Sequence, residues 1–528
     1  MDNIAFFHYL LFLVFGAGLL TWLAERVAVA PAVVLLLGGT VVALAGGYPA
    51  VDMDPGLILA AVLPPLLMSS AFYTAWRDFR RELLPIASLV LGAVAFTTVA
   101  VAVVVHALAP ALPWPACFAL GAIVSPPDAV AAKAMLQRFP LPARLVTVLE
   151  GESLINDASG LLLYQMAVAA GMSGLLTPGR GVAVFFTLSL VGVAVGFACG
   201  QAMVWLIKRL RDPVLCIVLS FLMAWASYGL AEHLHGSGVL SVVTCGLVLG
   251  IRQHQAFNAD MRIKAEAAWE TVVFVLEALV FILVGLALHG ILERMASTAS
   301  MWRISLHVAL PAVGAVIVAR LLWVAVAIYL PSKLAARAGR SPHPWSLGES
   351  VVLGWAGMRG VVSLAAALAL PERFPGRDII IFSTFVVIFA TLVGQGLSLA
   401  PLIRLLKLRP VRPGNLMSEL EARSHAFRAS LVELERRRAD DAGEDAAAID
   451  RLIEEYRVRV RNNANAHREG QEHVQRRSRQ LRLELDLVGT SRQELLRLHH
   501  AGRISDAVLH RIEGELDFEE LRLHRLLD

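Results

Sequence analysis

The sequence predicts an all-α polytopic membrane protein that ends in a cytosolic helical tail, and three observations support this prediction. The 528 residues are 57% hydrophobic and only 17% charged, and the mean hydropathy is +0.64, which is typical of multi-span membrane proteins. Apolar runs long enough to cross a bilayer follow one another up to about residue 405. From residue 413 onward, Arg, Glu and His become dense. We therefore expect a membrane domain over residues 1–412 and a helical tail over residues 413–528.

Taken in order, the apolar runs predict about thirteen transmembrane helices, because one crossing needs roughly 20 apolar residues. The approximate spans are 4–24, 29–46, 56–75, 83–109, 114–136, 143–172, 181–207, 213–234, 238–252, 267–290, 304–331, 347–370 and 378–405. If the N-terminus is outside, the inner loops hold 15 Lys and Arg residues and the outer loops hold 5. Because cytoplasmic loops carry the excess of basic residues, this bias predicts an outer N-terminus and a cytosolic C-terminus.

The tail lacks any run that could cross a bilayer, and its apolar residues recur at helical spacing. Ser491 and Glu494 fit a capping box, and Ser505 fits a further helix start. The mixed charges over residues 451–482 fit either a solvated helix face or a surface for a partner or a lipid. The tail is thus a candidate for binding a cytosolic regulator or for self-association.

Residues 149–160, LEGESLINDASG, place acidic side chains, an Asn and two Ser inside a hydrophobic run. At 3.6 residues per turn, Ser153 and Asp157 share one stripe of a helix, and Glu152 and Asn156 share the adjacent stripe. A charged group near a bilayer centre is costly, so a membrane helix that keeps one usually uses it. The ion-pair interpretation fits Glu152 better, and the functional interpretation fits Asp157 better.

Two further spans are interrupted. Span five contains SPPD at residues 125–128, where adjacent prolines forbid a regular helix and free backbone carbonyls for a cation. Asp128 is then either an ion ligand or a charge that offsets the positive end of the second half-helix, and we favour the second role. Span twelve contains GWAGMRGVVS at residues 354–363, where Arg359 would balance the negative helix ends. Broken helices in matching positions of two halves predict the inverted repeats of a secondary transporter, with spans five and twelve crossing.

Span eleven carries Arg320 within an apolar run, so this cation needs a buried partner. Glu152 is the best candidate for that partner. A Glu152–Arg320 ion pair would leave Asp157 as the carboxylate that is available to titrate and to exchange ions. Neither a nucleotide-binding loop nor a hydrolase motif accompanies the spans, which argues against an enzyme and against ATP-driven transport. We therefore expect no cofactor and no nucleic acid, and membrane lipids as the surroundings.

With these residues in place, the chain resembles the first monovalent cation:proton antiporter family, in its bacterial sodium/proton exchanger form. The resemblance covers roughly residues 5–410. It is based on five motifs that occur in the family's order, namely LPP at 63–65, SPPDAVA at 125–131, GESLIND at 151–157, AR at 319–320 and GMRG at 357–360. One feature departs from the family: many members carry an acid a few residues after LPP, where this chain has Met68, Ser69 and Ser70.

The resemblance implies a homodimer in which a core moves like an elevator against a dimerisation part. The dimerisation part would cover about residues 1–80 and 181–290, and the core about residues 83–172 and 304–405. By the same resemblance, Asp157 binds the cation or the proton, and Asp157 and Ser153 are ligands of Na⁺. Asn156 assists, the carbonyl near Pro127 is a further ligand, and Glu152 and Arg320 form a structural ion pair.

These expectations define a function and its alternatives. We expect exchange of Na⁺, or of Li⁺ or K⁺, for H⁺ across the inner cell membrane, with competition at Asp157. By the same resemblance, the pair Asn156–Asp157, in place of the two adjacent aspartates of the electrogenic relatives, implies electroneutral exchange. The alternatives are a K⁺-selective antiporter, an ion channel, and a membrane sensor that binds ions and signals through its tail. A channel is disfavoured because the site is a single carboxylate and not a ring of ligands around an axis.

Overall fold

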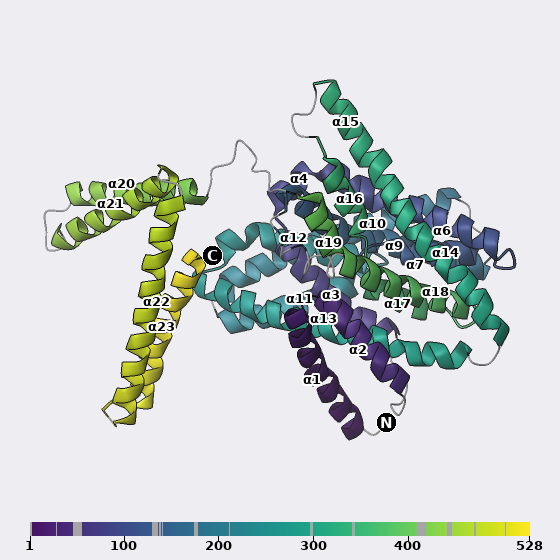
Figure 1. Ribbon diagram of the computed structural model, residues 1–528, viewed down its shortest axis with the longest axis horizontal. Helices are drawn as coiled ribbons and strands as arrows, with labels where there is room; N and C mark the ends of the chain where they lie inside the picture. The colour runs from purple at the N-terminus through teal and green to yellow at the C-terminus, as the bar shows by residue number, and fades with distance from the viewer. Residues whose placement is uncertain are drawn as a thin grey trace. The chain divides into compact units, whose positions relative to one another are not determined.

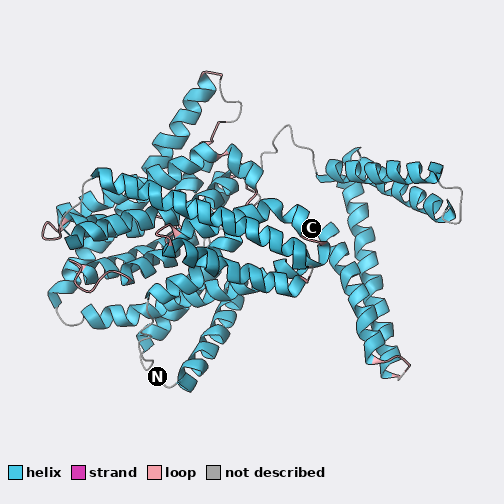
Figure 2. Ribbon diagram, turned by 180° about the vertical axis from the view of Figure 1, so that it is seen from behind, coloured by secondary structure: helices cyan, strands magenta, loops and turns pink. Residues whose placement is uncertain are grey.

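A computed structural model describes the chain in two compact units, Met1–Val411 and Arg412–Asp528. The described residues exclude 1–2, 28, 46–54, 129–135, 137–138, 140, 174–177, 211, 296–298, 340–343, 409–418, 441–445, 469–470, 502 and 528. Every regular element among the described residues is a helix, and short loops join the helices (Figure 2). The all-α prediction is confirmed for this part of the chain.

The helices of the first unit follow the order of the predicted spans (Figure 1). They are α1 (Asn3–Val27), α2 (Pro31–Ala45), α3 (Pro55–Phe72), α4 (Trp76–Arg81), α5 (Leu83–Ala87), η1 (Ser88–Ala93), α6 (Val94–Leu108), α7 (Trp114–Val124), α9 (Ala143–Ser173), α10 (Pro178–Leu210), α11 (Pro213–His233), α12 (Gly238–Ala256), α13 (Ala259–Met295), α14 (Ala299–Trp323), η2 (Val324–Tyr329), α15 (Leu330–Arg337), α16 (Leu347–Trp355), α17 (Val361–Leu368), α18 (Arg377–Phe389), η3 (Ala390–Gln395) and α19 (Gly396–Leu406).

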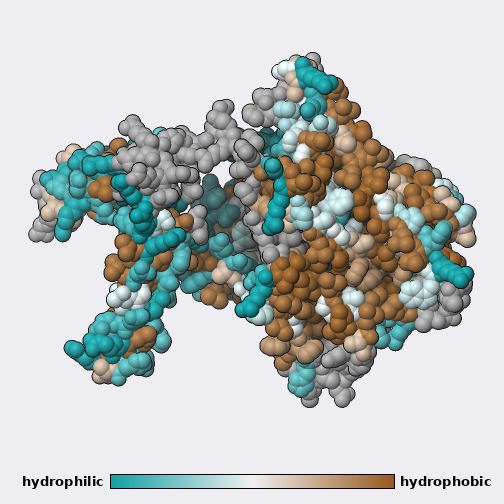
Figure 3. All heavy atoms as spheres, viewed as in Figure 1, coloured by the Kyte–Doolittle hydropathy of each residue, from teal (hydrophilic) through white to brown (hydrophobic). Residues whose placement is uncertain are grey.

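Among the described residues, six helices are long and apolar enough to cross a membrane. These helices are Leu83–Leu108, Ala183–Leu210, Pro213–His233, Ala259–Glu293, Trp302–Arg337 and Arg377–Leu406. Three shorter apolar helices accompany them, at Pro31–Ala45, Ala60–Phe72 and Trp114–Val124. The outer surface of the first unit is mostly apolar in the view of Figure 3. A protein with many such helices and an apolar exterior is a multi-pass membrane protein.

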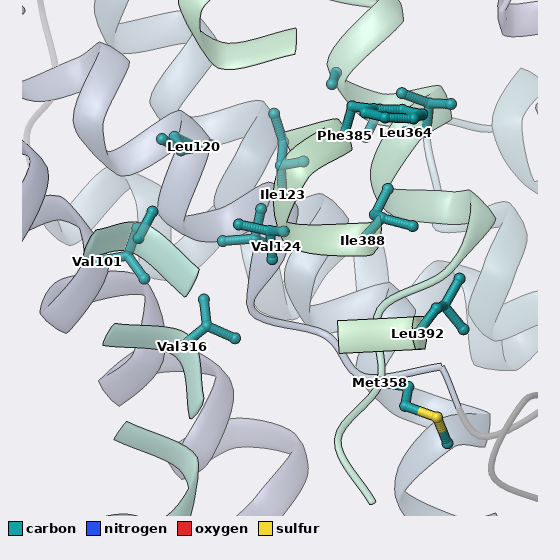
Figure 4. Close-up of a cluster of buried hydrophobic side chains, with 14 of the residues drawn as sticks. Val101, Leu120, Ile123, Val124, Val316, Met358, Leu364, Phe385, Ile388 and Leu392 are labelled. Atoms are coloured by element: carbon teal, nitrogen blue, oxygen red, sulfur yellow. The ribbon is translucent and has the colours of Figure 1, made fainter. Parts of the chain in front are cut away.

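Buried apolar side chains form two main clusters in the first unit. The larger cluster joins α2, α6, α7, α14, α18 and the second half of α13. Figure 4 shows part of it beside the end of α7, with labelled side chains Val101, Leu120, Ile123, Val124, Val316, Met358, Leu364, Phe385, Ile388 and Leu392. The smaller cluster joins α3, α10, α11 and α12, and it includes Leu154 of α9. Helix α9 therefore contributes side chains to both clusters.

Glycines bring the helices of the smaller cluster into close contact. Gly192, Gly196 and Gly200 lie four residues apart on α10 and face α12. A Cβ atom at Gly196 would overlap the backbone of Ser241. Small residues at this spacing let two membrane helices approach backbone to backbone, which replaces the hydrophobic effect as a source of association in lipid.

The second unit consists of two helical hairpins. Helix α20 (Glu419–Asp440) packs with α21 (Ala446–Arg468), and α22 (Gln471–His500) packs with α23 (Asp506–Leu527). Leu481, Val488 and Leu523 form the buried contact of the second hairpin. The Arg492 guanidinium lies 2.5 Å from the Asp517 carboxylate and 2.7 Å from the Glu520 carboxylate.

One helix start predicted in the tail is wrong. Helix α22 continues through Ser491 and Glu494 instead of beginning there. The apolar face of α22 that packs on α23 reaches Val488, so this contact keeps the flanking turns helical despite the capping sequence. The start predicted at Ser505 is confirmed, because its hydroxyl accepts a hydrogen bond from the Val508 amide and α23 begins at Asp506.

Candidate functional site

Helix α9 carries the predicted carboxylates, and two of its faces meet different surroundings. Glu152 is buried and faces Arg320 of α14. The two guanidinium nitrogens of Arg320 lie 2.6 Å and 2.8 Å from the two carboxylate oxygens of Glu152. Arg320 also donates to the Leu353 carbonyl at 3.2 Å. The structure thus brings the predicted pair together in a bidentate geometry, which is the strong form of this interaction.

The helices α7 and α16 end where the sequence predicts interruptions, and the segments that follow them touch each other. Helix α7 ends at Val124, and α16 ends at Trp355 before α17 begins at Val361. The Asp128 amide donates a hydrogen bond of 2.7 Å to the Met358 carbonyl, which joins the two non-helical segments. The predicted second half of span five falls largely on residues 129–135, which lie outside the described residues.

Arg359 is fully buried between the interrupted helices. Its side chain donates to the Val124 carbonyl at 2.7 Å and to the Ser125 carbonyl at 3.1 Å, both at the C-terminal end of α7. It also donates to the Gly357 carbonyl, just after α16. A guanidinium at these helix ends satisfies carbonyls that have no partner within the helix, and it offsets their negative dipole charge. The arrangement is the one expected of a charge that balances helix ends.

The Asp128 side chain lies beside the N-terminal end of α17. A Cβ atom at Gly360, the N-cap residue of α17, would overlap the Asp128 carboxylate, so glycine is required for this approach. A carboxylate beside a helix N-terminus is stabilised by the positive end of the helix dipole. Asp128 also lines the cavity described below, so its position fits both roles that the sequence leaves open.

Asn156 is buried, and its side-chain amide donates to the Pro127 carbonyl at 2.5 Å. Its Oδ1 atom has no hydrogen-bond partner among the described residues. Ser159, one turn further, donates to the Val90 carbonyl of η1 at 2.8 Å. Two of the carbonyls that the sequence predicts to be open to a cation accept hydrogen bonds from the protein. Arg359 donates to the Ser125 carbonyl, and Asn156 donates to the Pro127 carbonyl.

A cavity of about 600 Å³ lies between α3, α9, α13 and α17. Ser153 and Asp157 of α9 line it, together with Pro126 and Asp128 of the first interruption. Helix α3 contributes Ser69, where the family departure falls. Its lining holds the carboxylates of Asp128, Glu150, Asp157, Glu266, Glu270 and Glu277 and, within the described part of the chain, neither Lys, Arg nor His. Such a cavity favours a cation over an anion.

The sequence predictions omitted one part of this lining. Three glutamates of α13, Glu266, Glu270 and Glu277, share the cavity with Asp157. Their spacing of four and seven residues was a usable signal, since it places them on one helix face. Glu277 in addition stands alone among apolar residues in the middle of a predicted span.

An apolar helical unit whose interrupted helices meet beside a cavity lined by carboxylates has the architecture of a secondary transporter. This chain belongs to the sodium/hydrogen exchanger family, whose transmembrane family model matches residues 10–405.

Individual relatives agree with this assignment. An uncharacterized Na⁺/H⁺ exchanger of Mycobacterium tuberculosis is 32% identical over 515 residues, which cover 95% of this chain and 93% of the relative. A sodium, potassium, lithium and rubidium/H⁺ antiporter of Bacillus pumilus is 28% identical over 78% of this chain and 63% of the relative. The solved sodium proton antiporter MjNhaP1 of Methanocaldococcus jannaschii has the same fold, with a TM-score of 0.62 at 19% identity. That match covers 78% of this chain and 100% of MjNhaP1.

Proposed function

We propose that this protein exchanges Na⁺, or Li⁺ or K⁺, for H⁺ across the cell membrane, with both ions competing for Asp157. One observation carries the proposal: Asp157 lines the carboxylate-rich cavity, whereas Glu152 on the neighbouring stripe of α9 is neutralised by Arg320. Ser153 and Asp157 would hold the cation. Asn156 would assist, and the carbonyl near Pro127, to which the Asn156 amide donates, would be a further ligand.

The exchange would be electroneutral and would proceed by an elevator movement. With one exchangeable carboxylate, Asp157 carries either one proton or one monovalent cation in each direction. The core (83–172 and 304–405) would move against the dimerisation part (1–80 and 181–290) of a homodimer. Cavity residues come from both parts, Asp157 from the first and Ser69 from the second, which is the placement that such a movement needs. Thirteen spans in inverted repeats, with an outer N-terminus and a cytosolic C-terminus, complete this proposal.

The tail, residues 413–528, would bind a cytosolic regulator or a second copy of itself. Its surface helices carry dense, mixed charge, with Arg438 paired to Asp450 at 2.9 Å and Arg457 paired to Glu435 at 3.2 Å.

Flux through purified protein in liposomes tests the function. A Na⁺ gradient imposed across proteoliposomes should drive proton movement that a pH-sensitive dye reports, at a rate that an imposed membrane potential does not change. A series of Na⁺, Li⁺, K⁺ and Rb⁺ then identifies the preferred cation, and a response to K⁺ alone would favour the K⁺-selective alternative. Current without proton counterflow would indicate a channel, and the absence of any flux would indicate a sensor.

A further inference from the structure

Glu277 occupies a position in α13 where a charge is costly. Residues 271–288, TVVFVLEALVFILVGLAL, contain Glu277 as their one acidic or basic residue. Helix α13 includes the most apolar of the candidate membrane windows, with a hydropathy of 2.7. A carboxylate at the centre of a membrane helix costs about 2.5–3.5 kcal/mol on insertion scales. A neutral side chain would serve packing better, so the position calls for a use of the charge.

The register of α13 turns Glu277 towards the cavity. Glu266, Glu270, Val273, Glu277 and Val280 line it at steps of three, four and seven residues, which is one face of the helix. Glu266 and Glu270 are exposed, whereas Glu277 is partly buried. With a rise of 1.5 Å per residue, Glu277 lies about 16 Å further along the helix than Glu266.

The groups that share this cavity with Glu277 include those of the proposed exchange site. Asp157 and Ser153 line the cavity from α9, and Ser69 and Ser70 line it from α3. Helix α13 packs against α3 and α17, which closes the ring of helices around this space. A carboxylate at a partly buried position acts on a cation through a lower effective dielectric than one at an exposed mouth, so its attraction is stronger and less screened by salt.

We infer that Glu277 determines the apparent affinity of this cavity for the transported cation, as a further negative charge in the cavity that Asp157 lines. This inference rests on the proposed exchange function. In this role Glu277 raises the local concentration and the residence time of a monovalent cation before Asp157 takes it up. Asp157 alone carries the ion across, so loss of the Glu277 charge weakens binding without removing transport.

The test measures Na⁺-driven proton flux in variants that each lose one carboxylate charge. It is made at alkaline pH, where protons compete least with Na⁺. Glu277→Gln should raise the half-saturating Na⁺ concentration on the order of tenfold, while the maximal rate stays within about twofold of the wild type. The matched control is Glu266→Gln, which removes the same charge from an exposed position on the same face of α13. Its smaller effect should disappear when choline chloride is added to about 0.5 M, because the Debye length then falls below about 5 Å.

A relocated charge separates an electrostatic role from a structural one. The double change Glu277→Gln with Ser69→Glu moves the acid from α13 to α3 within the same cavity and should restore most of the lost affinity. Glu277→Asp should stay close to the wild type in half-saturation. An unchanged half-saturation in well-folded Glu277→Gln would overturn the inference, as would a fall in maximal rate alone. A wild-type protein that shows no exchange would instead refute the proposed function itself.

Discussion

Asp157 and Glu152 lie five positions apart on α9 and have different surroundings. Glu152 accepts two hydrogen bonds from Arg320. Glu152 is 1% exposed and Arg320 is 2% exposed, so this pair is almost fully buried. Asp157 is partly buried and borders an open cavity of about 600 Å³. A group that must gain and lose an ion needs access of this kind, whereas a buried, paired charge holds helices together.

Replacing Asp157 by Asn should reduce Na⁺-driven proton flux to the background of empty liposomes. The amide has the shape of the protonated carboxyl group, but it can neither release a proton nor hold a cation by charge. The melting temperature of the purified protein should remain near that of the wild type, which controls for folding. Substantial residual flux in Asp157→Asn would show that another group carries the ion.

Glu152→Gln should destabilise the protein by about 3–5 kcal/mol, because it leaves the Arg320 guanidinium buried without its counter-charge. Arg320→Gln should have a comparable effect for the converse reason. The double change should recover part of the loss, since no unpaired charge then remains in that place. Thermal melting of the three variants in detergent gives the coupling energy between Glu152 and Arg320. If the effects of the two single changes simply add up in the double variant, the two residues are not coupled.

At the scale of elements, the packing of the helices depends on glycines and on the positions at which helices are interrupted. The close contact of α10 with α12 relies on Gly196, because a Cβ there would overlap the Ser241 backbone. The breaks at residues 125–128 and 356–360 let Arg359 reach two helix ends at once. Both arrangements depend on groups that reach a neighbouring backbone closely. At Gly196, a larger residue would prevent this approach.

Gly196→Ala should destabilise the membrane unit by about 1–3 kcal/mol, the range for overpacking a tight contact. Gly229 of α11 provides a matched control, because nothing lies within 4 Å of the Cβ that Ala would add there. Gly229→Ala should leave the melting temperature unchanged or raise it slightly, as Ala has the higher helix propensity. Equal melting temperatures for the two variants would argue against a close α10–α12 contact.

At the scale of the whole molecule, the chain divides into two compact units, Met1–Val411 and Arg412–Asp528. The first unit holds all the cavity residues and both interrupted helices. The second unit has its own small apolar contact at Leu481, Val488 and Leu523 and its own ion pairs. Each unit therefore has the internal contacts that independent folding requires.

A chain truncated after Val411 should insert, fold and retain most of its Na⁺-driven proton flux in liposomes. The separate fragment 419–528 should be soluble and helical by circular dichroism. Loss of flux in a truncated protein that melts like the full chain would show that the tail is needed for transport itself and not only for regulation.

Sequence alone determined the features that depend on local chemistry. Apolar runs mark helices because backbone groups in lipid must bond within their own segment. Adjacent prolines and clustered glycines disfavour a regular helix, and helices end directly before residues 125–128 and 356–360, although α3 continues through Pro64 and Pro65. The need of Arg320 for a buried acid pointed to Glu152, since an uncompensated charge in an apolar interior is strongly unfavourable.

Only the tertiary structure decided which residues line the same cavity and which groups contact each other. The sequence shows that Glu277 stands in an apolar run, but the side of α13 that faces Asp157 depends on how α13 is rotated against α3 and α17. Likewise, the prolines predicted free carbonyls, and only the fold shows that Arg359 and Asn156 take them. Helix rotation and pairing are set by contacts between residues far apart in the chain, such as Arg359 with Val124, and no local pattern contains that information.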